Sequence, residues 1–363
     1  MTSSPRARRF QIRLIRILTI AIGWFGAGAF QAWYDYFLLR SKDLTFDVYL
    51  EMFSRGITGF TGGLISGILL SVILEKWLRQ RSYGFIFIST IGIYLILMLC
   101  ISFPSAYIYF SSSLDLELGD PAILDRLTKY VTGFGYVKDF VFWGIVIILT
   151  VFAITIRDKY GPGVIWNLIT GKYHKPRHEN RIIMFLDIKA STTIAEQLGE
   201  QKFFNLVNDF IGDATDQILW TKGEIYQYIG DEIVVTWKLK SGLESNNFMR
   251  CFFGIKKVID NRKAYYLEQY GVVPEFKAGI HEGLCMVGEL GVLKREISFY
   301  GDLINSTARI QGLCNEKNAE LLVSDALLNL VSDKSFYLIE PLGAVSLKGR
   351  VGQIEISKVG LAG

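Results

Sequence analysis

The chain divides into two parts by the spacing of its hydrophobic positions. In the first part, four uncharged stretches reach or approach the length that a helix needs to cross the ~30 Å hydrocarbon core of a bilayer. They are Ile17–Tyr34, Gly56–Leu74, Ser82–Phe103 and Phe140–Ile156. We therefore predict a membrane domain over residues 1–156, with four transmembrane helices in contact with lipid.

After a polar and basic linker at 157–180, the pattern changes to strands and amphipathic helices. The apolar run Ile182–Leu186, which ends in Asp187, predicts a buried strand, and Thr193 with Glu196 predicts a capping box that opens a helix. The elements expected next are a long helix through 203–218, strands at Glu224–Ile229 and Glu232–Trp237, a helix over about 246–268, a strand at Phe276–His281, a helix from Asp302 and a closing hairpin over Ser346–Val359. This order predicts an α+β fold, with a ferredoxin-like α/β sandwich over residues 181–360.

Composition and charge support this division and orient the membrane domain. Half of the residues (50%) are apolar and 14% are aromatic, which is too hydrophobic for an ordinary soluble protein. The basic clusters are Arg6–Arg16, Lys76–Arg81 and Arg157–Lys159, whereas the loop near 105–136 carries Asp115, Glu117, Asp120 and Asp125. Because basic loops face the cytoplasm, we predict a multi-pass protein of the cell (inner) membrane with its N-terminus and second domain cytoplasmic. The small net charge of +4 suits a membrane surface better than nucleic acid, so no nucleic-acid partner is expected.

Small residues form a stripe within the second predicted span. Gly59, Gly63 and Gly67 recur every four residues, so they share one helix face on which another helix could pack closely. The partner is either a second copy of the chain or another helix of the same bundle. The sequence leaves both alternatives open.

Two carboxylates are expected to meet at one edge of the predicted sheet. Asp187 ends the buried strand, and Asp231 lies in the turn of the hairpin that should pair beside it. Two such carboxylates repel each other unless a hard divalent cation neutralises them. Taken singly, Asp187 would be a strand-end cap and Asp231 a turn residue. Taken together, they suggest a metal site for a triphosphate.

Four motifs in order give the pair a context. They are FLDIKASTTIAEQLG at 185–199, IYQYIGDEIVV at 225–235, YGDLINSTARIQGLC at 300–314 and LKGR at 347–350. Together they resemble the catalytic domain of class III adenylate and guanylate cyclases. The resemblance covers about 180–358, roughly half of the chain.

The resemblance implies a role for each matching position. Asp187 and Asp231 would bind two Mg²⁺ ions, with Mn²⁺ as the alternative, and the backbone carbonyl of Ile188 would be a further ligand. Asn305 and Arg309 would orient the ribose and stabilise the charge on the α-phosphate. Their spacing of four residues places them on one face of one helix.

The implied reaction is attack of the ribose 3′-hydroxyl of ATP on the α-phosphorus, with pyrophosphate leaving. Lys348 would hold the terminal phosphates. The resemblance also implies a homodimer through the catalytic domain, with the membrane helices as a second contact. Each active site would then combine residues of both subunits.

The two positions that read the purine depart from the commonest patterns. Gln227 stands where adenylate cyclases usually carry Lys and guanylate cyclases Glu, and Ser298 where they often carry Asp or Cys. Both side chains are uncharged and can donate or accept, so either purine could be bound. A Ser or Thr at the second position occurs in a bacterial subgroup that makes cyclic AMP, which favours adenylate cyclase.

The alternatives are a guanylate cyclase and a catalytically silent membrane signalling scaffold. The filled metal and transition-state positions argue against the scaffold. A diguanylate cyclase would have a related hairpin, but it has no place for the Asn305/Arg309 helix or for Lys348.

Overall fold

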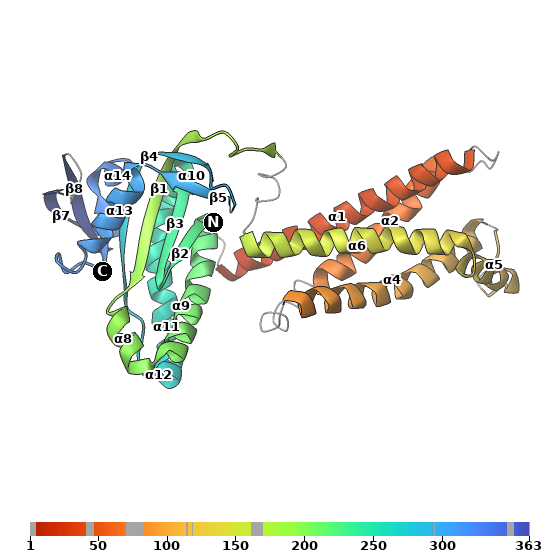
Figure 1. The fold of residues 1–363 in the computed structure, drawn as a ribbon, viewed down its shortest axis with the longest axis horizontal. Helices are drawn as coiled ribbons and strands as arrows, with labels where there is room; N and C mark the ends of the chain where they lie inside the picture. The colour runs from red at the N-terminus through yellow and green to blue at the C-terminus, as the bar shows by residue number, and fades with distance from the viewer. Residues whose placement is uncertain are drawn as a thin grey trace. The chain divides into compact units, whose positions relative to one another are not determined.

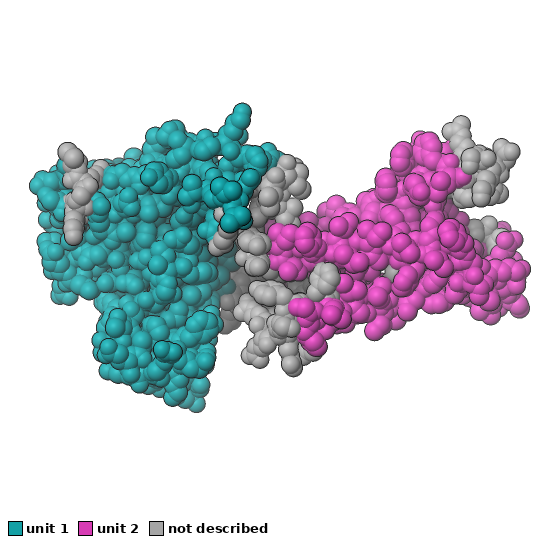
Figure 2. All heavy atoms as spheres, in the orientation of Figure 1, with its two compact units in different colours: residues 1–9, 170–363 teal, residues 10–169 magenta. Residues whose placement is uncertain are grey.

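The computed structural model describes residues 5–40, 47–69, 83–113, 115–117, 119–160, 170–293, 295–346 and 352–362. The chain forms two compact units, one of residues 1–9 with 170–363 and one of residues 10–169 (Figure 2).

The unit of residues 10–169 is helical (Figure 1). Its helices are α1 (Pro5–Arg40), α2 (Val48–Ile68), α4 (Tyr83–Ser113), α5 (Pro121–Val131) and α6 (Phe134–Tyr160). Among the described residues, three segments are long and apolar enough to cross a membrane, and they are Arg13–Leu38, Ile88–Ser112 and Phe134–Arg157. These three segments overlap the first, third and fourth predicted spans. The four-helix prediction is not confirmed, because the second span, Gly56–Leu74, extends beyond the described part of α2.

Two boundaries in this unit differ from the prediction. Helix α4 does not end at Phe103 but continues through Pro104 to Ser113, because its apolar pattern continues past the proline. The segment 105–136, expected to be a loop, is therefore largely helical. Helix α5 begins at Pro121, where Asp120 accepts a hydrogen bond from the Ala122 amide (2.8 Å) and fixes the first turn.

The glycine stripe of α2 packs against α1 of the same chain. A Cβ atom on Gly59 or Gly63 would collide with the α1 backbone at Trp24 or Ala21. The absence of side chains therefore lets the two helix backbones approach closely. This is the intrachain alternative of the two that the sequence left open.

The second unit is a β-sheet of parallel and antiparallel strands that is covered by helices (Figure 1). Its strands are β1 (Arg177–Ile188), β2 (Glu224–Ile229), β3 (Glu232–Lys238), β4 (Phe276–Leu290), β5 (Glu296–Tyr300), β6 (Leu321–Ser324), β7 (Tyr337–Ser346) and β8 (Gln353–Leu361). The strand order is β2-β3-β1-β4-β6-β8-β7, and β5 pairs with the far end of β4. Within the sheet, strands β2, β3, β1 and β4 lie side by side in this order, which is the order that the predicted split βαβ unit requires.

The helices of this unit cover the two faces of the sheet unequally. They are α8 (Ser191–Leu198), α9 (Glu200–Trp220), α10 (Leu239–Leu243), α11 (Asn247–Asn261), α12 (Lys263–Tyr270), α13 (Asp302–Gly312) and α14 (Asp325–Asn329). Alternate residues of β1 point to opposite faces. Met184 and Leu186 join the main core with α9 and α11, whereas Ile183 and Phe185 pack in a smaller cluster with residues of α13 and β5.

Three local predictions for this unit were wrong. The helix after β1 begins at Ser191 without a side-chain cap, so Thr193 and Glu196 do not form a capping box. The Lys189 amide still bonds to the Glu275 carbonyl (2.8 Å), and the chain turns only at Ala190, whose φ is 52°.

The helix expected over 246–268 is broken into α11 and α12 at Arg262, whose side chain bonds to Asp213 of α9 (2.5 Å). The closing hairpin begins at Tyr337, before the predicted Ser346, and it extends past Val359 to Leu361.

Candidate active site

The ends of β1 and of the β2–β3 hairpin bring Asp187 and Asp231 together. Strand β1 pairs with β3 up to Leu186 opposite Ile233, so the next residue of β1 lies beside the hairpin turn. Gly230 allows this turn by adopting a φ of 64°. Burial, and next the neighbouring Asp231 carboxylate, raise the pKa of Asp187 above its usual range. The predicted meeting of the two carboxylates is therefore present in this structure.

Two further side chains contact Asp187, and the sequence did not point to either. Lys277 lies opposite Asp187 in the β1–β4 register, and its Nζ is 3.5 Å from Asp187 Oδ2. Gln311 of α13 donates from Nε2 to the same oxygen (2.9 Å). Both contacts lower the pKa of Asp187 and offset part of the rise. The available signal for Lys277 was a charged residue inside the otherwise apolar run Phe276–Ile280.

Glu232 belongs to the same electrostatic cluster. Burial, and then the Asp187 and Asp231 carboxylates, raise the pKa of Glu232 to about 7. The Glu232 side chain is half-buried at the start of β3. The cluster thus combines three acidic side chains with one nearby ammonium group, that of Lys277.

The donor set at this edge fits a hard divalent cation. Asp231 Oδ2 is buried and has no hydrogen-bond partner in the part of the chain that the structure describes. A buried carboxylate oxygen without a partner is destabilising unless a cation binds it. No described group of three or more His, Cys, Asp or Glu side chains could hold a metal. A metal would therefore be bound by the two aspartates together with backbone oxygens, for which the carbonyl of Ile188 at the end of β1 is a candidate.

The other predicted site residues that the structure describes lie on α13, β2 and β5. Asn305 is exposed and Arg309 is half-buried, one turn apart on α13. Among the described residues, neither forms a hydrogen bond or ion pair with Asp187 or Asp231.

Gln227 is exposed on β2, and Ser298 is half-buried on β5. Their neighbours Tyr226 and Phe299 meet edge to face, with ring centroids 4.7 Å apart. This contact holds the two strands beside each other, although β5 was not predicted. Lys348 lies outside the described residues.

Comparison with known proteins identifies the domain. The family of adenylate and guanylate cyclase catalytic domains matches residues 173–358, which is just over half of the chain. The chain belongs to this family. The cyclase domain begins within the predicted linker, and β1 starts at Arg177, before the predicted domain boundary at residue 181.

Individual relatives and structures agree on the cyclase domain. The chain is 34% identical to adenylate cyclase 2 of Rhizobium meliloti (strain 1021) over 200 residues. The aligned region covers 55% of each protein. It is 28% identical over 180 residues to guanylyl cyclase C of Rattus norvegicus, covering 48% of this chain and 16% of that protein. The chain thus spans about half the length of the adenylate cyclase that it matches. The structure of a bacterial light-regulated adenylyl cyclase is similar in fold, with a TM-score of 0.51 and 23% identity over 59% of this chain and 64% of that one.

Proposed function

We propose that the protein is a membrane-anchored adenylate cyclase that converts ATP to 3′,5′-cyclic AMP and pyrophosphate. The observation that carries the proposal is the half-buried pair Asp187 and Asp231, with a buried Asp231 oxygen that no described group satisfies. Adenylate rather than guanylate cyclase is favoured because the 34% identical relative is an adenylate cyclase, whereas the guanylyl cyclase C match is 28% identical.

In this proposal the carboxylates of Asp187 and Asp231, with the Ile188 carbonyl, hold two Mg²⁺ ions, or Mn²⁺ in their place. The bound metal would neutralise the triphosphate and favour ionisation of the ribose 3′-hydroxyl. Lys277 and Gln311 hold Asp187 in place through its Oδ2 atom. Arg309 stabilises the charge that develops on the α-phosphate, and Asn305 orients the ribose.

Two copies of the chain build each site in this proposal. Asp187 and Asp231 come from one subunit, while Gln227, Ser298, Asn305, Arg309 and Lys348 come from the other. The support is that Asn305 and Arg309, among the described residues, do not bond to the carboxylates of their own chain. The homodimer forms through the catalytic domain and the membrane helices, and a two-fold axis gives two equivalent sites.

The anchoring proposed is in the cell membrane, with several crossings and both termini in the cytoplasm. Its support is the three apolar helices, with the predicted span Gly56–Leu74 as the further crossing that an even number requires, together with the basic N-terminus and the acidic segment between α4 and α6. ATP then reaches the site from the cytoplasm.

The test is an assay of the full-length protein in membranes with ATP or GTP and with Mg²⁺ or Mn²⁺. We expect metal-dependent cyclic AMP and little cyclic GMP. Formation of cyclic GMP alone would favour the guanylate cyclase alternative. No cyclic nucleotide under any combination would favour the silent scaffold.

The purine preference has its own variant. Gln227→Glu should shift the preference toward GTP, because a carboxylate accepts hydrogen bonds from guanine N1 and N2. An unchanged ratio of ATP to GTP turnover would mean that the purine is read elsewhere.

A further inference from the structure

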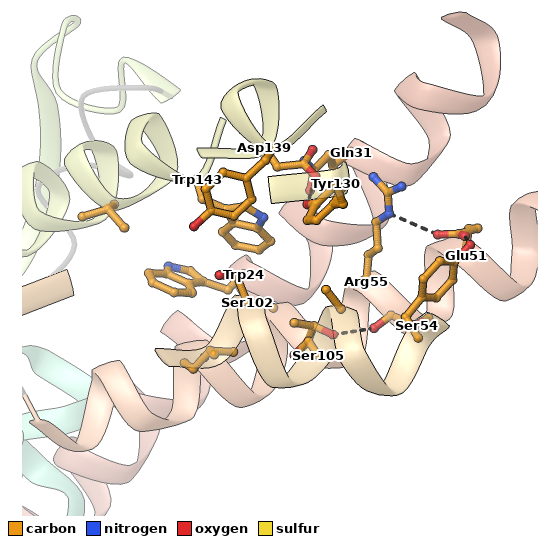
Figure 3. Close-up of a pocket in the computed structure, with 18 of the residues that line it drawn as sticks. Trp24, Gln31, Glu51, Ser54, Arg55, Ser102, Ser105, Tyr130, Asp139 and Trp143 are labelled. Atoms are coloured by element: carbon orange, nitrogen blue, oxygen red, sulfur yellow. Dashed lines mark hydrogen bonds and ion pairs between the residues drawn. The ribbon is translucent and has the colours of Figure 1, made fainter. Parts of the chain in front are cut away.

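The helical unit contains a cavity that the cyclase chemistry does not use. Its volume is about 320 Å³, and α1, α2, α4, α5 and α6 all contribute to its wall (Figure 3). This size is within the range of sites for small molecules. The lining changes from aromatic to charged along the cavity.

The first part of the wall is aromatic. Trp24 lies between Tyr94 and Trp143, with ring centroids 5.8 Å and 5.7 Å apart. The Trp24 indole N–H donates to Thr150 Oγ1 (3.0 Å), so its polar group is already satisfied. What these rings offer a ligand is their π faces, which attract apolar groups and cations.

The second part of the wall is charged, and Glu51, Arg55 and Asp139 lie there (Figure 3). Arg55 donates to Glu51 (3.1 Å) and to Asp35 (2.5 Å). Lys138 forms ion pairs with Asp35 and, at 3.3 Å, with Asp139. Among the described side chains of this group, three acids therefore meet two bases.

The third feature is a pair of hydroxyl groups without partners. Ser66 and Tyr136 both line the cavity. In the described part of the chain, the Ser66 Oγ and Tyr136 Oη atoms are buried and have no hydrogen-bond partner. Only 1% of Ser66 is exposed. Buried polar atoms are nearly always satisfied, so these two oxygens indicate a polar occupant.

The charge balance decides which occupant fits. An acyl chain of a lipid would fill the aromatic part but would leave the surplus negative charge uncompensated. An anion would add to the surplus. A cation neutralises it beside Glu51 and Asp139, and aromatic faces stabilise ammonium groups further. Ionisable residues within apolar bundles commonly mark ligand or ion pathways.

We propose that this cavity, between the Trp24/Trp143 wall and the Glu51/Asp139 wall, is a binding site for a small amphiphile with one ammonium group and an apolar body. The ammonium group lies between the two carboxylates, and the apolar body lies against Trp24, Tyr94 and Trp143. The site lies at the end of the bundle that carries α5. With the topology proposed above, it receives its ligand from outside the cytoplasm.

The direct test compares three probes of equal size on the full-length protein in lipid nanodiscs. Phenylbutylamine carries a cation, phenylbutanol is neutral and phenylbutyrate is an anion. Because Trp24 and Trp143 line the cavity, binding can be followed by tryptophan fluorescence and confirmed by calorimetry. We expect the amine to bind at least about tenfold more tightly than the alcohol, and the anion most weakly. Equal binding of amine and alcohol, preference for the anion or binding of none would overturn the proposal.

Variants separate the charge from the cavity itself. Glu51→Gln and Asp139→Asn should each weaken the amine about tenfold while the alcohol still binds, which also shows that the bundle is intact. Asp125→Asn, which removes an exposed acid paired with Lys129, is the matched control and should change nothing. Amine affinity retained in both acid variants would overturn the assignment of the ammonium site.

A third variant tests whether the ligand binds in this cavity, and it changes no charge. Ala106 lines the cavity on α4, and Ala106→Phe would fill it. Binding of both amine and alcohol should then be lost. Undiminished amine binding would locate the site elsewhere and refute the proposal, whatever the acid variants show.

Discussion

The carboxylate cluster of the cyclase domain and Asp35 of the helical unit differ in the balance of charges around them. In the cyclase domain, Asp187, Asp231 and Glu232 lie together, and among the described residues Lys277 is the basic group beside them. In the helical unit, Asp35 is only 5% exposed at its side chain and lies between Arg55 and Lys138. The first set is ready for cations from outside the chain, whereas Asp35 joins α1 to α2 and α6. The comparison teaches that the balance of charges, not the residue type, separates a reactive carboxylate from a structural one.

The largest expected effect tests the cyclase side of this comparison. Asp231→Ala should reduce cyclic nucleotide formation at least about a thousandfold, because the triphosphate loses its bridging metal ions. It should not lower the thermal stability, because the carboxylate that it removes repels Asp187. Asp260→Ala, at an exposed acid of α11, is the matched control for both measurements. Activity retained in Asp231→Ala and in Asp187→Ala would falsify the metal assignment.

The next prediction concerns the helical unit, where the order of effects should be reversed. Asp35→Ala removes the partner that Arg55 and Lys138 share, while Arg55 keeps Glu51 and Lys138 keeps Asp139, so the bundle should lose about 1–3 kcal/mol of stability. Thermal unfolding of the protein in nanodiscs measures this loss. Asp125→Ala removes only an exposed pair with Lys129 and should change stability by about 0.5 kcal/mol or less. If the two variants unfold at the same temperature, the ion pairs of Asp35 do not stabilise the bundle.

A third experiment asks whether the cyclase carboxylates are completed by a second copy. Chains with Asp231→Ala and chains with Arg309→Ala should each be inactive as homodimers. With random pairing, half of the dimers are mixed and half of their sites are intact, so co-expression should restore about a quarter of the activity. The readout is cyclic nucleotide from membranes that hold both variants. Mixed dimers without recovered activity would show that each site is built within one chain.

The smallest expected effect is on the pH dependence of stability. The folded pKa of Glu232 is about 7, above its usual 4.5, so the folded state holds more protons between these values. Stability of the metal-free protein should therefore fall as the pH rises through this window. Glu232→Gln should flatten this part of the unfolding profile, whereas Glu268→Gln, at an exposed acid of α12, should not. A wild-type profile that is flat there would contradict the assigned burial of Glu232.

The sequence predicted most reliably what depends on neighbouring residues. The bounds of β2 matched Glu224–Ile229, and those of β3 differed only at Lys238, because alternation and the Gly230-Asp231 turn determine a hairpin locally. Asp187 and Asp231 could be paired because the hairpin had to lie beside the first strand.

Contacts between distant segments could not be predicted in the same way. Gln311 reaches Asp187 only because α13 packs on β4 and β1, and the break at Arg262 depends on Asp213 of another helix. Strand β5 was missed because its five residues carry only a short alternation, with Ile297 and Phe299 packed in the smaller cluster. In the bundle, hydropathy predicted the apolar helices. It gave no sign that Asp35, Arg55 and Lys138 would meet.

The glycine contact between α1 and α2 has a mechanical consequence. Side chains normally act as compliant spacers that let packed helices slide by changing rotamer. At Gly59 and Gly63 no side chain separates the α2 backbone from Trp24 and Ala21, so that freedom is missing. Helices α1 and α2 should therefore move together as one rigid body. When a ligand enters the cavity, the helices that can be displaced are α4, α5 and α6.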